Sequence, residues 1–461
     1  MTYSFSFDAS SCSGCKACQE ACKDKNGLPV GVLWRRVIEV TGGSWLATGP
    51  AWENSVFAYS LSLACNHCAY PKCAGVCPTS AYSVRPDGVV LLDTTKCMGC
   101  GYCAWACPYG APQYNAELGV MSKCNFCVDD LDSGLPPSCV AACPLRALDC
   151  KTIETWEPAK GIQPLWEIPS NKYPFPLPDD THTEPHLAIK PHPGMNSLSE
   201  KLISNREEIQ PRRPGKVFKG RAFDELPLVA FTLLMQMAVG IFICLLTLPR
   251  VSPALLLSIG GLWAIGGLVA FLHLGKKRNA WRALAHLKKS WLSRETLMAG
   301  LFGAAWMLIA TMWWLQKVFL LPWLMAFLGL GLLYSMAQIY RLKAVPAWNS
   351  WRTPVSFFMS AVILGTLGVN LALPARQWAI LASLVMAVEL ALTLYNQSFA
   401  RGGAKTIRMV LLGMGIIGAF FLISFPVANR LALALPVFLV ILAGEAIERF
   451  EFYAKSLQSG I

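Results

Sequence analysis

The stretch Cys97-Met-Gly-Cys-Gly-Tyr-Cys-Ala-Trp-Ala-Cys-Pro108 decides the fold of the first third of this 461-residue chain. Its spacing, C-x2-C-x2-C-x3-C followed by proline, is typical of ferredoxins that bind [4Fe–4S] clusters. With this stretch, sixteen of the eighteen cysteines form four runs: Cys12-Cys15-Cys18-Cys22, Cys65-Cys68-Cys73-Cys77, Cys97-Cys100-Cys103-Cys107 and Cys124-Cys127-Cys139-Cys143. Sixteen thiolates would ligate four clusters with none left over.

Two other uses of cysteine fit this pattern less well. A disulfide framework also uses an even number of cysteines, but its spacing is irregular. Zinc sites close with two pairs of cysteines, whereas each complete run here brings three together and then adds a fourth. Proline follows the last cysteine of three runs, at Pro78, Pro108 and Pro144. The sequence therefore predicts iron–sulfur clusters, with Cys150 and Cys244 as ordinary small apolar residues.

The composition changes along the chain. The first 150 residues hold 17 of the 18 cysteines, and Pro86-Asp87-Gly88 is a turn signal before the strand-forming run Val89–Leu92. From Leu226 onward, long apolar stretches dominate. The predicted fold class is an α+β ferredoxin-like tandem four-cluster domain followed by an all-α polytopic bundle of eight transmembrane spans.

The predicted domains are a four-cluster electron-transfer domain over 1–153, an extended Pro-rich tail or linker over 154–224, and a membrane anchor with a quinol site over 225–461. Eleven prolines between Trp156 and Asp224 leave no helical or strand period, which indicates the extended tail. Each of eight apolar stretches is long enough to cross a bilayer. They are Leu226–Leu248, Ala254–Leu274, Thr296–Leu315, Val318–Tyr340, Val355–Leu373, Trp378–Tyr395, Met409–Phe425 and Leu431–Ile447.

The formal net charge of +12 is explained by membrane topology and not by nucleic-acid binding. Loops after the second, fourth and sixth spans carry thirteen positive residues: seven in Lys276–Arg294, then Arg341, Lys343 and Arg352, then Arg401, Lys405 and Arg408. The opposite loops carry four: Arg250, Lys317, Arg376 and Arg430. The positive-inside rule predicts a cytoplasmic cluster domain, and Met1–Ser10 shows no export signal. The apolar spacing in Lys276–Arg294 favours a basic interfacial helix over a solvated loop.

Two sets of longer motifs resemble one family. The segments Cys97–Asn115 (ending Cys-Pro-Tyr-Gly-Ala-Pro-Gln-Tyr-Asn) and Ser138–Leu148 are similar to the iron–sulfur electron-transfer (B-type) subunit of the dimethyl sulfoxide reductase family. The second half resembles its membrane anchor (C-type) subunit at Glu225–Thr232, His273–Gly275, Val345–Trp348 and Ala443–Glu445. Together the likenesses cover nearly the whole chain, which looks like a fusion of the two subunits.

The resemblance implies a role in anaerobic respiration. The anchor would oxidise menaquinol from the quinone pool of a prokaryotic cell (inner) membrane, as this chain's own half-reaction. Four [4Fe–4S] clusters would then relay electrons to a separate large molybdopterin subunit that reduces an S-oxide or N-oxide. This chain has no motif for the molybdenum cofactor. Many members of the family are exported with a twin-arginine partner, which leaves the exported side as the alternative location of the cluster domain.

The cluster ligands follow partly from spacing and partly from the family. In two-cluster ferredoxins, the fourth cysteine of a run ligates the other cluster of the pair. The resemblance implies that the first run pairs with the fourth, and the second with the third. The predicted sets are Cys12/Cys15/Cys18/Cys143, Cys124/Cys127/Cys139/Cys22, Cys65/Cys68/Cys73/Cys107 and Cys97/Cys100/Cys103/Cys77.

Ionisable groups within membrane spans are costly and are therefore candidates for a site. His273, Glu295, Arg341 and Glu445 all fall near span ends that topology places on one face, and we predict them as a quinol site. Quinol oxidation needs bases for two protons, and a histidine–carboxylate group supplies them. Glu389 is either a structural pair or part of a proton path. With His273 as the one histidine in the spans, a bis-histidine haem is not expected.

Two other functions remain open. A donor-linked quinone reductase would run the same electron path in reverse. A membrane scaffold with structural clusters is the third possibility, although four clusters exceed what a scaffold needs. The sequence does not distinguish the terminal substrate, the direction of electron flow or the cluster potentials.

Overall fold

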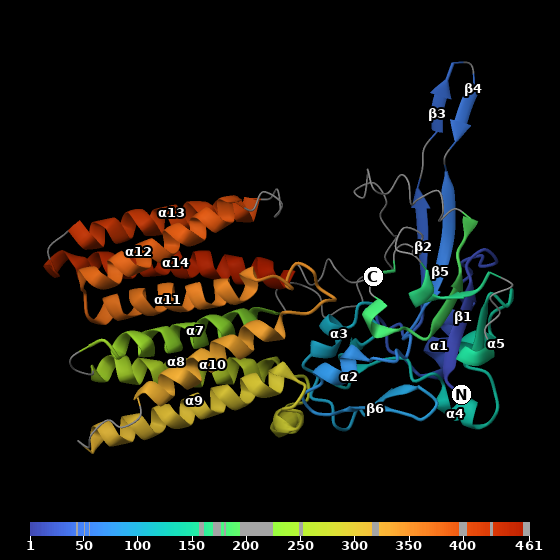
Figure 1. Cartoon of the computed structure of the whole chain (residues 1–461), viewed down its shortest axis with the longest axis horizontal. Helices are drawn as coiled ribbons and strands as arrows, with labels where there is room; N and C mark the ends of the chain where they lie inside the picture. Colours follow the sequence, from blue (N-terminus) through green and yellow to red (C-terminus); the bar gives the residue numbers. More distant parts are fainter. Residues whose placement is uncertain are drawn as a thin grey trace. The chain divides into compact units, whose positions relative to one another are not determined.

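The structure, a computed structural model, divides into two compact units, which lie within Met1–Gly220 and Arg221–Ser459 (Figure 1). It describes residues 1–42, 45–49, 51–54, 56–155, 161–168, 177–178, 181–193, 225–248, 252–315, 322–395, 403–424 and 427–454. Most of the predicted linker lies outside these residues, including Pro158, Pro169, Pro174 and Pro176. So do the basic residues Arg250, Lys317 and Arg401 and the side chains of Lys405 and Arg430.

A four-stranded sheet holds the first unit together. Its order is β10 (Leu148–Thr152), β1 (Tyr3–Asp8), β12 (Leu187–Lys190) and β11 (Gln163–Pro164). Strand β1 is antiparallel to β10 and parallel to β12. Strands β11 and β12 fall in the range where we predicted an extended tail, because local composition does not reveal a long-range pairing with β1. The sheet of the cluster domain therefore extends to Lys190.

Short elements lie between the cysteines. Helices α1 (Ala17–Lys25), α2 (Lys72–Val76), α3 (Tyr102–Ala106) and α5 (Ser138–Ala141) each contain a cysteine of a different run, and α4 (Val128–Asp132) follows Cys127. Two hairpins join the inner runs to their neighbours: β6 (Tyr82–Val84) with β7 (Val90–Leu92), and β8 (Gln113–Asn115) with β9 (Val120–Ser122). The turn predicted at Pro86-Asp87-Gly88 connects β6 to β7, and Gly88 there has φ +82°.

A long hairpin projects from this unit (Figure 1). Strand β2 (Arg36–Gly42) pairs antiparallel with β5 (Phe57–Leu63), and β3 (Trp45–Thr48) pairs with β4 (Ala51–Asn54). The base of β5 is buried, whereas all four residues of β4 are exposed. The base of the hairpin therefore belongs to the core, and its tip does not.

The second unit is a bundle of antiparallel helices. Those described are α7 (Leu226–Leu245), α8 (Pro253–His273), α9 (Trp291–Trp314), α10 (Pro322–Ile339), α11 (Arg352–Ala372), α12 (Arg376–Tyr395), α13 (Gly403–Ser424) and α14 (Val427–Ala454). An α+β domain followed by a helical bundle is thus confirmed. Within the described ranges, seven helices, α7 to α13, are long and apolar enough to cross a membrane. The eighth predicted span, Leu431–Ile447, lies in α14, which carries more charge and is not among the seven.

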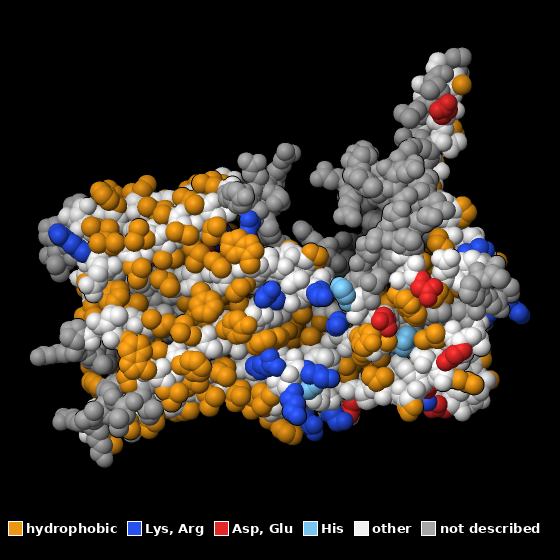
Figure 2. Space-filling view, in the orientation of Figure 1, with side chains coloured by type: hydrophobic (Ala, Val, Ile, Leu, Met, Phe, Trp, Pro, Cys, Tyr) orange, Lys and Arg blue, Asp and Glu red, His pale blue; other side chains and the backbone are white. Residues whose placement is uncertain are grey.

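Burial distinguishes the central helix from the outer ones. In α7, 72% of the most apolar window is buried inside the protein, compared with 17% in α9. Helix α7 packs against α8, α10, α11 and α14. The visible face of the bundle is almost wholly hydrophobic, and Lys and Arg gather mainly at one end (Figure 2). Helix α7 therefore forms the core, and the other faces are suited to lipid. Within the basic segment Lys276–Arg294, where an interfacial helix was predicted, Lys277–Leu284 form a 3-10 helix, η7.

Glycines allow neighbouring helices to approach closely. A Cβ added at Gly240 of α7 would collide with the carbonyl oxygen of Ala361 in α11, and one at Gly365 would collide with the backbone of Gly240. Helices α8 and α9 each place a tryptophan on a glycine of the other helix. The ring of Trp263 in α8 packs on Gly303, and the ring of Trp306 in α9 packs on Gly260. Each indole N–H donates to the opposite helix, to Ala299 O and Leu256 O, both at 2.8 Å.

We expect Gly240→Ala to destabilise the bundle by roughly 1–3 kcal/mol, because backbone atoms of α11 cannot yield to a methyl group as a side chain can. Gly300→Ala is the matched control, since nothing lies within 4 Å of a Cβ at that position. It should be neutral or stabilise by up to about 1 kcal/mol through helix propensity. Thermal unfolding in mild detergent measures both, and equal melting temperatures would contradict the close α7–α11 contact.

Candidate iron–sulfur and quinol sites

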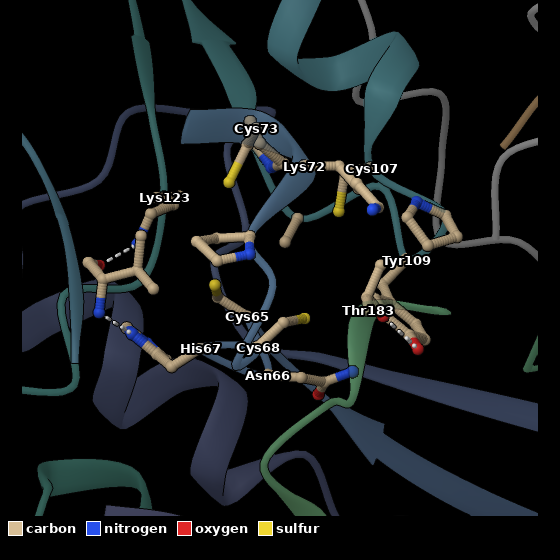
Figure 3. A pocket seen from close by; sticks show the side chains of 15 residues that line it. Cys65, Asn66, His67, Cys68, Lys72, Cys73, Cys107, Tyr109, Lys123 and Thr183 are labelled. Atoms are coloured by element: carbon tan, nitrogen blue, oxygen red, sulfur yellow. Dashed lines mark hydrogen bonds between the residues drawn. The ribbon is translucent and has the colours of Figure 1, made fainter. Parts of the chain in front are cut away.

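Four thiols of the inner runs line one cavity. Cys65, Cys68, Cys73 and Cys107 surround it together with Asn66, Lys72, Tyr109 and Thr183. Their sulfur atoms face a common space (Figure 3). Helix α2, which holds Cys73, ends just before Cys77, and Cys77 does not line this cavity. Cys107, the fourth cysteine of the third run, lines it instead. This is the set predicted from ligand exchange between paired runs.

The outer runs form a second cavity of the same kind. Cys12, Cys15, Cys18 and Cys143 line it, with Pro144 beside the last of them. Helix α1 of the first run packs against α5 of the fourth, and α2 of the second run packs against α3 of the third. The structure therefore brings together the pairs of runs that the family resemblance implied.

The remaining thiols lie close enough to repel one another when ionised. Burial, together with Cys139 and Cys127, raises the pKa of the Cys22 thiol to about 12. Burial followed by Cys22, Cys65 and Cys139 likewise raises the pKa of Cys124. Burial and the neighbouring Cys77 and Cys97 raise the pKa of Cys100 to about 12, and the pKa of Cys103 is raised by burial with Cys100, Cys97 and Cys77. Apart from Cys65, which belongs to the first cavity, these neighbours are members of the other two predicted sets.

All four runs share one backbone feature that the sequence analysis missed. The residue before the second cysteine has positive φ in each: Gly14 (+72°), His67 (+43°), Gly99 (+72°) and Phe126 (+65°). This turn points amides at sulfur, since Gly99 N–H donates to Cys97 Sγ and Phe126 N–H to Cys124 Sγ, both at 3.4 Å. Glycine is the local signal in two runs, but His67 and Phe126 adopt this conformation at a cost.

Two adjacent arginines are buried beside different thiol sets. Arg35 is 2% exposed, and its Nη1 donates to Ser62 Oγ at 3.2 Å. Burial lowers the pKa of Arg35, but the thiolate charges, led by Cys139 and Cys124, outweigh burial and raise it. Arg36 donates from Nη2 to Tyr109 O at 2.8 Å, and burial lowers its pKa against the opposing charge of Cys107. Each guanidinium therefore places a positive charge at one pair of sites.

Lys123 and His67 are a third polar feature, at the cavity of the inner runs. Both are buried, and Lys123 Nζ donates to the carbonyl oxygens of Val90 and, at 2.9 Å, of Cys124. The Val90 N–H donates to His67 Nδ1 at 3.0 Å, so a neutral His67 carries its proton on Nε2. Burial, followed by the charges of Lys123, His186 and Arg35, lowers the pKa of His67 well below its usual range. His67 is therefore neutral here.

The donor sets fit iron–sulfur clusters. Each set offers four thiols, which is the ligand number of a [4Fe–4S] cluster. Burial and mutual repulsion disfavour thiolates in these positions unless bound iron compensates their charge. Amides directed at sulfur and buried arginines supply further compensation. When bound, such clusters accept and release single electrons.

A buried acid–base group lies at one end of the helical bundle. His273 Nε2 is 3.9 Å from Glu225 Oε2, and both side chains are 7% exposed. Glu295, near the start of α9, is also buried, and its Oε1 has no hydrogen-bond partner among the described residues. Glu225 was not among the predicted site residues, although it opens one of the family motifs. The group Glu225, His273 and Glu295 is called the acid–base group below.

The other two predicted quinol-site residues have different surroundings. Arg341 is exposed. Glu445 is buried, and Ser360 Oγ lies 2.5 Å from its Oε2, in a second group of charged side chains that includes Glu389. Two tyrosines adjoin the acid–base group: Tyr340 lies within electrostatic reach of Glu295 and Glu225, and its hydroxyl is 2.6 Å from that of Tyr453.

Comparisons with known proteins match both units. Residues 56–153 match the family described as 4Fe-4S dicluster domain, and residues 220–402 match DMSO reductase anchor subunit (DmsC). The B subunit of the anaerobic dimethyl sulfoxide reductase of Escherichia coli (strain K12) is 45% identical over 209 residues, which are 45% of this chain and 98% of that protein. The probable anaerobic dimethyl sulfoxide reductase subunit YnfG of the same strain is 43% identical over the same shares. The formate dehydrogenase iron-sulfur subunit of Wolinella succinogenes is 39% identical over 166 residues, 31% of this chain and 78% of that protein.

The thiol sets and the apolar bundle define a multi-pass membrane protein that carries electrons through iron–sulfur clusters. More particularly, the chain belongs to the dimethyl sulfoxide reductase family, with a B-like iron–sulfur region fused to a DmsC anchor domain. It is the electron-transfer and membrane-anchor part of a DMSO reductase-type complex, and such a complex implies a catalytic subunit as its partner. The predicted family and fusion are confirmed.

We expect Arg35→Gln to lower the midpoint potentials of the clusters held by the outer runs. A nearby cation stabilises the reduced, more negative cluster, and its loss should cost roughly 50–100 mV, or about 1–2.5 kcal/mol for one electron. Arg36→Gln is the matched neighbour and should affect the cluster that includes Cys107 instead. Potentiometric titration followed by electron paramagnetic resonance separates these shifts. Identical effects of the two variants would contradict the assignment of one arginine to each pair.

Proposed function

We propose that this chain oxidises menaquinol and passes the electrons through four [4Fe–4S] clusters to a molybdopterin subunit that reduces an S-oxide or N-oxide. One observation carries the proposal: a single chain holds both the sixteen paired thiols and a buried acid–base group in the anchor. The relatives named dimethyl sulfoxide reductase support the choice of substrate class.

The proposed cluster ligands are the four sets of cysteines predicted above, in a tandem ferredoxin-like domain. The convergence of Cys65, Cys68, Cys73 and Cys107 on one cavity supports the exchange of fourth ligands. The functional divisions we propose are 1–153 for electron transfer, 154–224 for the connection and 225–461 for the anchor. Strand β12 lies in the connection but also completes the sheet of the first unit.

The acid–base group is the proposed site of quinol oxidation. Oxidation of a quinol to a quinone releases two electrons and two protons. The Glu295 carboxylate and the His273 imidazole can each accept one proton, and Glu225 would stabilise the resulting imidazolium. Burial of all three side chains excludes bulk water from the proton transfers. No haem is needed in this scheme.

The proposed location is the cell (inner) membrane of a prokaryote, with eight spans that include α14 and with the cluster domain in the cytoplasm. Basic residues at one end of the helices support this orientation. Quinol oxidation and substrate reduction would then occur on the same side. The alternative is an exported cluster domain, carried across the membrane with its partner.

A second candidate function uses the same parts in the opposite direction. The relative named formate dehydrogenase iron-sulfur subunit supports a donor-linked quinone reductase, in which electrons enter at the clusters and reduce quinone in the anchor. The similarity to this relative covers only 31% of the chain, so it carries less weight than the dimethyl sulfoxide reductase relatives and we prefer the first function.

Metal content tests the proposed partner and cluster number. The complex should be purified from native membranes in mild detergent and analysed for iron, molybdenum and tungsten. We expect about sixteen iron atoms per chain from four cubane clusters and about one molybdenum from a large co-purifying subunit. Iron without molybdenum or tungsten in an intact complex would favour the donor-linked quinone reductase. About eight iron atoms would contradict four clusters.

Substitution in the acid–base group tests the quinol site. We expect Glu295→Gln and His273→Asn to slow reduction of the clusters by menadiol about 10²-fold or more, because each variant loses a proton acceptor. Reduction by dithionite, which bypasses the quinol site, should be unchanged. Lys343→Gln, an exposed residue of the loop after α10, is the control. Menadiol rates equal to wild type in both variants would place quinol oxidation elsewhere.

A further inference from the structure

The bundle contains a second buried group of charged residues that the proposed quinol chemistry does not use. Carboxylate oxygens of Glu389 in α12 and of Glu445 and Glu448 in α14 all lie within 4.8 Å of one another. Arg408 of α13 and Arg449 of α14 lie among them. These five side chains are called the carboxylate cluster. Glu389, Glu445 and Arg449 are at most 4% exposed.

The charges of the carboxylate cluster do not balance. Three carboxylates and two guanidinium groups leave one negative charge if every group is ionised. Burying an uncompensated charge inside a membrane protein is expensive, and such groups usually become neutral or bind a counter-ion. Arg408 already contacts Glu389 and lies 3.7 Å from Glu448 Oε1, and Arg449 Nε is 3.9 Å from Glu448 Oε2. Glu445 is therefore the carboxylate without an ion pair at this distance in the described structure.

Hydrogen bonding at Ser360 independently points to a proton on Glu445. A serine hydroxyl has one hydrogen to donate and two lone pairs. Ser360 Oγ lies 2.9 Å from the carbonyl oxygen of Ser356, which can only accept, and Arg449 Nη2, which can only donate, lies 3.1 Å away. Ser360 Oγ therefore has one hydrogen for two acceptors, Ser356 O and Glu445 Oε2 at 2.5 Å, and a proton on Glu445 allows both contacts to be hydrogen bonds.

We propose that the carboxylate cluster is a proton-binding site that holds one proton, on Glu445, at neutral pH. The proton makes the cluster neutral and provides the missing donor toward Ser360. A divalent cation would leave the cluster with a net positive charge, and Arg408 already bridges two of the three carboxylates. Glu448 also accepts a hydrogen bond from Ser356 Oγ at 2.9 Å, which favours its ionised form. The half-buried Glu451 also lies within electrostatic reach of Arg408.

Two tyrosines connect this site to the acid–base group. Tyr453 lies within electrostatic reach of both Arg449 and Glu295, and its hydroxyl is hydrogen-bonded to that of Tyr340. Both hydroxyls are buried and can donate and accept a proton. Resting on the proposed function, the carboxylate cluster then takes up one of the two protons that quinol oxidation releases as Glu445 gives up the proton it already holds, so the cluster stays neutral while both electrons pass to the iron–sulfur clusters.

Infrared spectroscopy tests the proton site without any quinol. In the purified complex at pH ~8, where exposed glutamates are ionised, we expect the carbonyl band of a protonated carboxyl group. Glu445→Gln should remove this band, and Glu451→Gln, outside the carboxylate cluster, should leave it. The amide of Gln can donate to Ser360 as a protonated acid would, so the melting temperature of Glu445→Gln should stay close to that of wild type. A band of undiminished intensity in Glu445→Gln, its absence from wild type, or a large loss of stability in this variant would overturn the proposal.

Charge balance provides a second test with the same spectrum. Arg408→Gln removes one positive charge, so the carboxylate cluster should bind a second proton and the carboxyl band should grow. Glu389→Gln removes one negative charge, so the band should be lost although Glu445 remains. A band that responds to Glu445→Gln but to neither of these variants would show an isolated acid and overturn the shared site.

The connection to the acid–base group is tested by kinetics. Tyr453→Phe removes one hydroxyl, and we expect it to slow cluster reduction by menadiol about tenfold while dithionite reduction is unchanged. An unchanged menadiol rate would overturn the connection. If menadiol fails to reduce even the wild-type clusters, the proposed quinol function is wrong, whereas the infrared result still decides whether the proton site exists.

Discussion

The convergence of four thiols on one small space is the constraint on which the first unit depends. Buried thiolates that repel one another are unstable until iron compensates their charge, so iron binding and folding of this domain are coupled. Many of its cysteines belong to the hydrophobic core itself, beside Phe5, Phe7 and Leu61. The short helices, the positive-φ turns and the buried arginines all serve to hold sulfur in place or to balance its charge.

The spacing of the cysteines was enough to predict the iron–sulfur sites of this domain. Run length and the proline after Cys107 predicted the local geometry, because ligand positions in a cluster loop are set by nearby backbone. The sequence did not reveal β12, since its partner β1 lies more than 170 residues away and prolines surround it. It also did not reveal the shared turn, because histidine and phenylalanine replace glycine at His67 and Phe126.

In the membrane unit, too, the local sequence predicts some features, whereas others depend on contacts between distant segments. Hydropathy placed the helices α7 to α13 to within about six residues at each end, because a membrane span needs a continuous apolar segment. It also placed His273, Glu295 and Glu445 near helix ends on one face. Which of these side chains meet depends on the rotation and neighbours of each helix. Glu225 joins His273, whereas Glu445 joins Glu389, and no local pattern distinguishes the two outcomes.

The parallel pairing of β12 with β1 also limits how freely the two units can separate. Since the sheet extends to Lys190, the segment between the last described residue of the first unit, Pro193, and the start of the second at Glu225 is thirty-one residues long. A covalent connection of this length keeps the anchor unit at a high local concentration around the iron–sulfur unit. Encounters between the two units are therefore first-order and are not slowed by dilution of the membrane, and the two units are always made in a ratio of one to one.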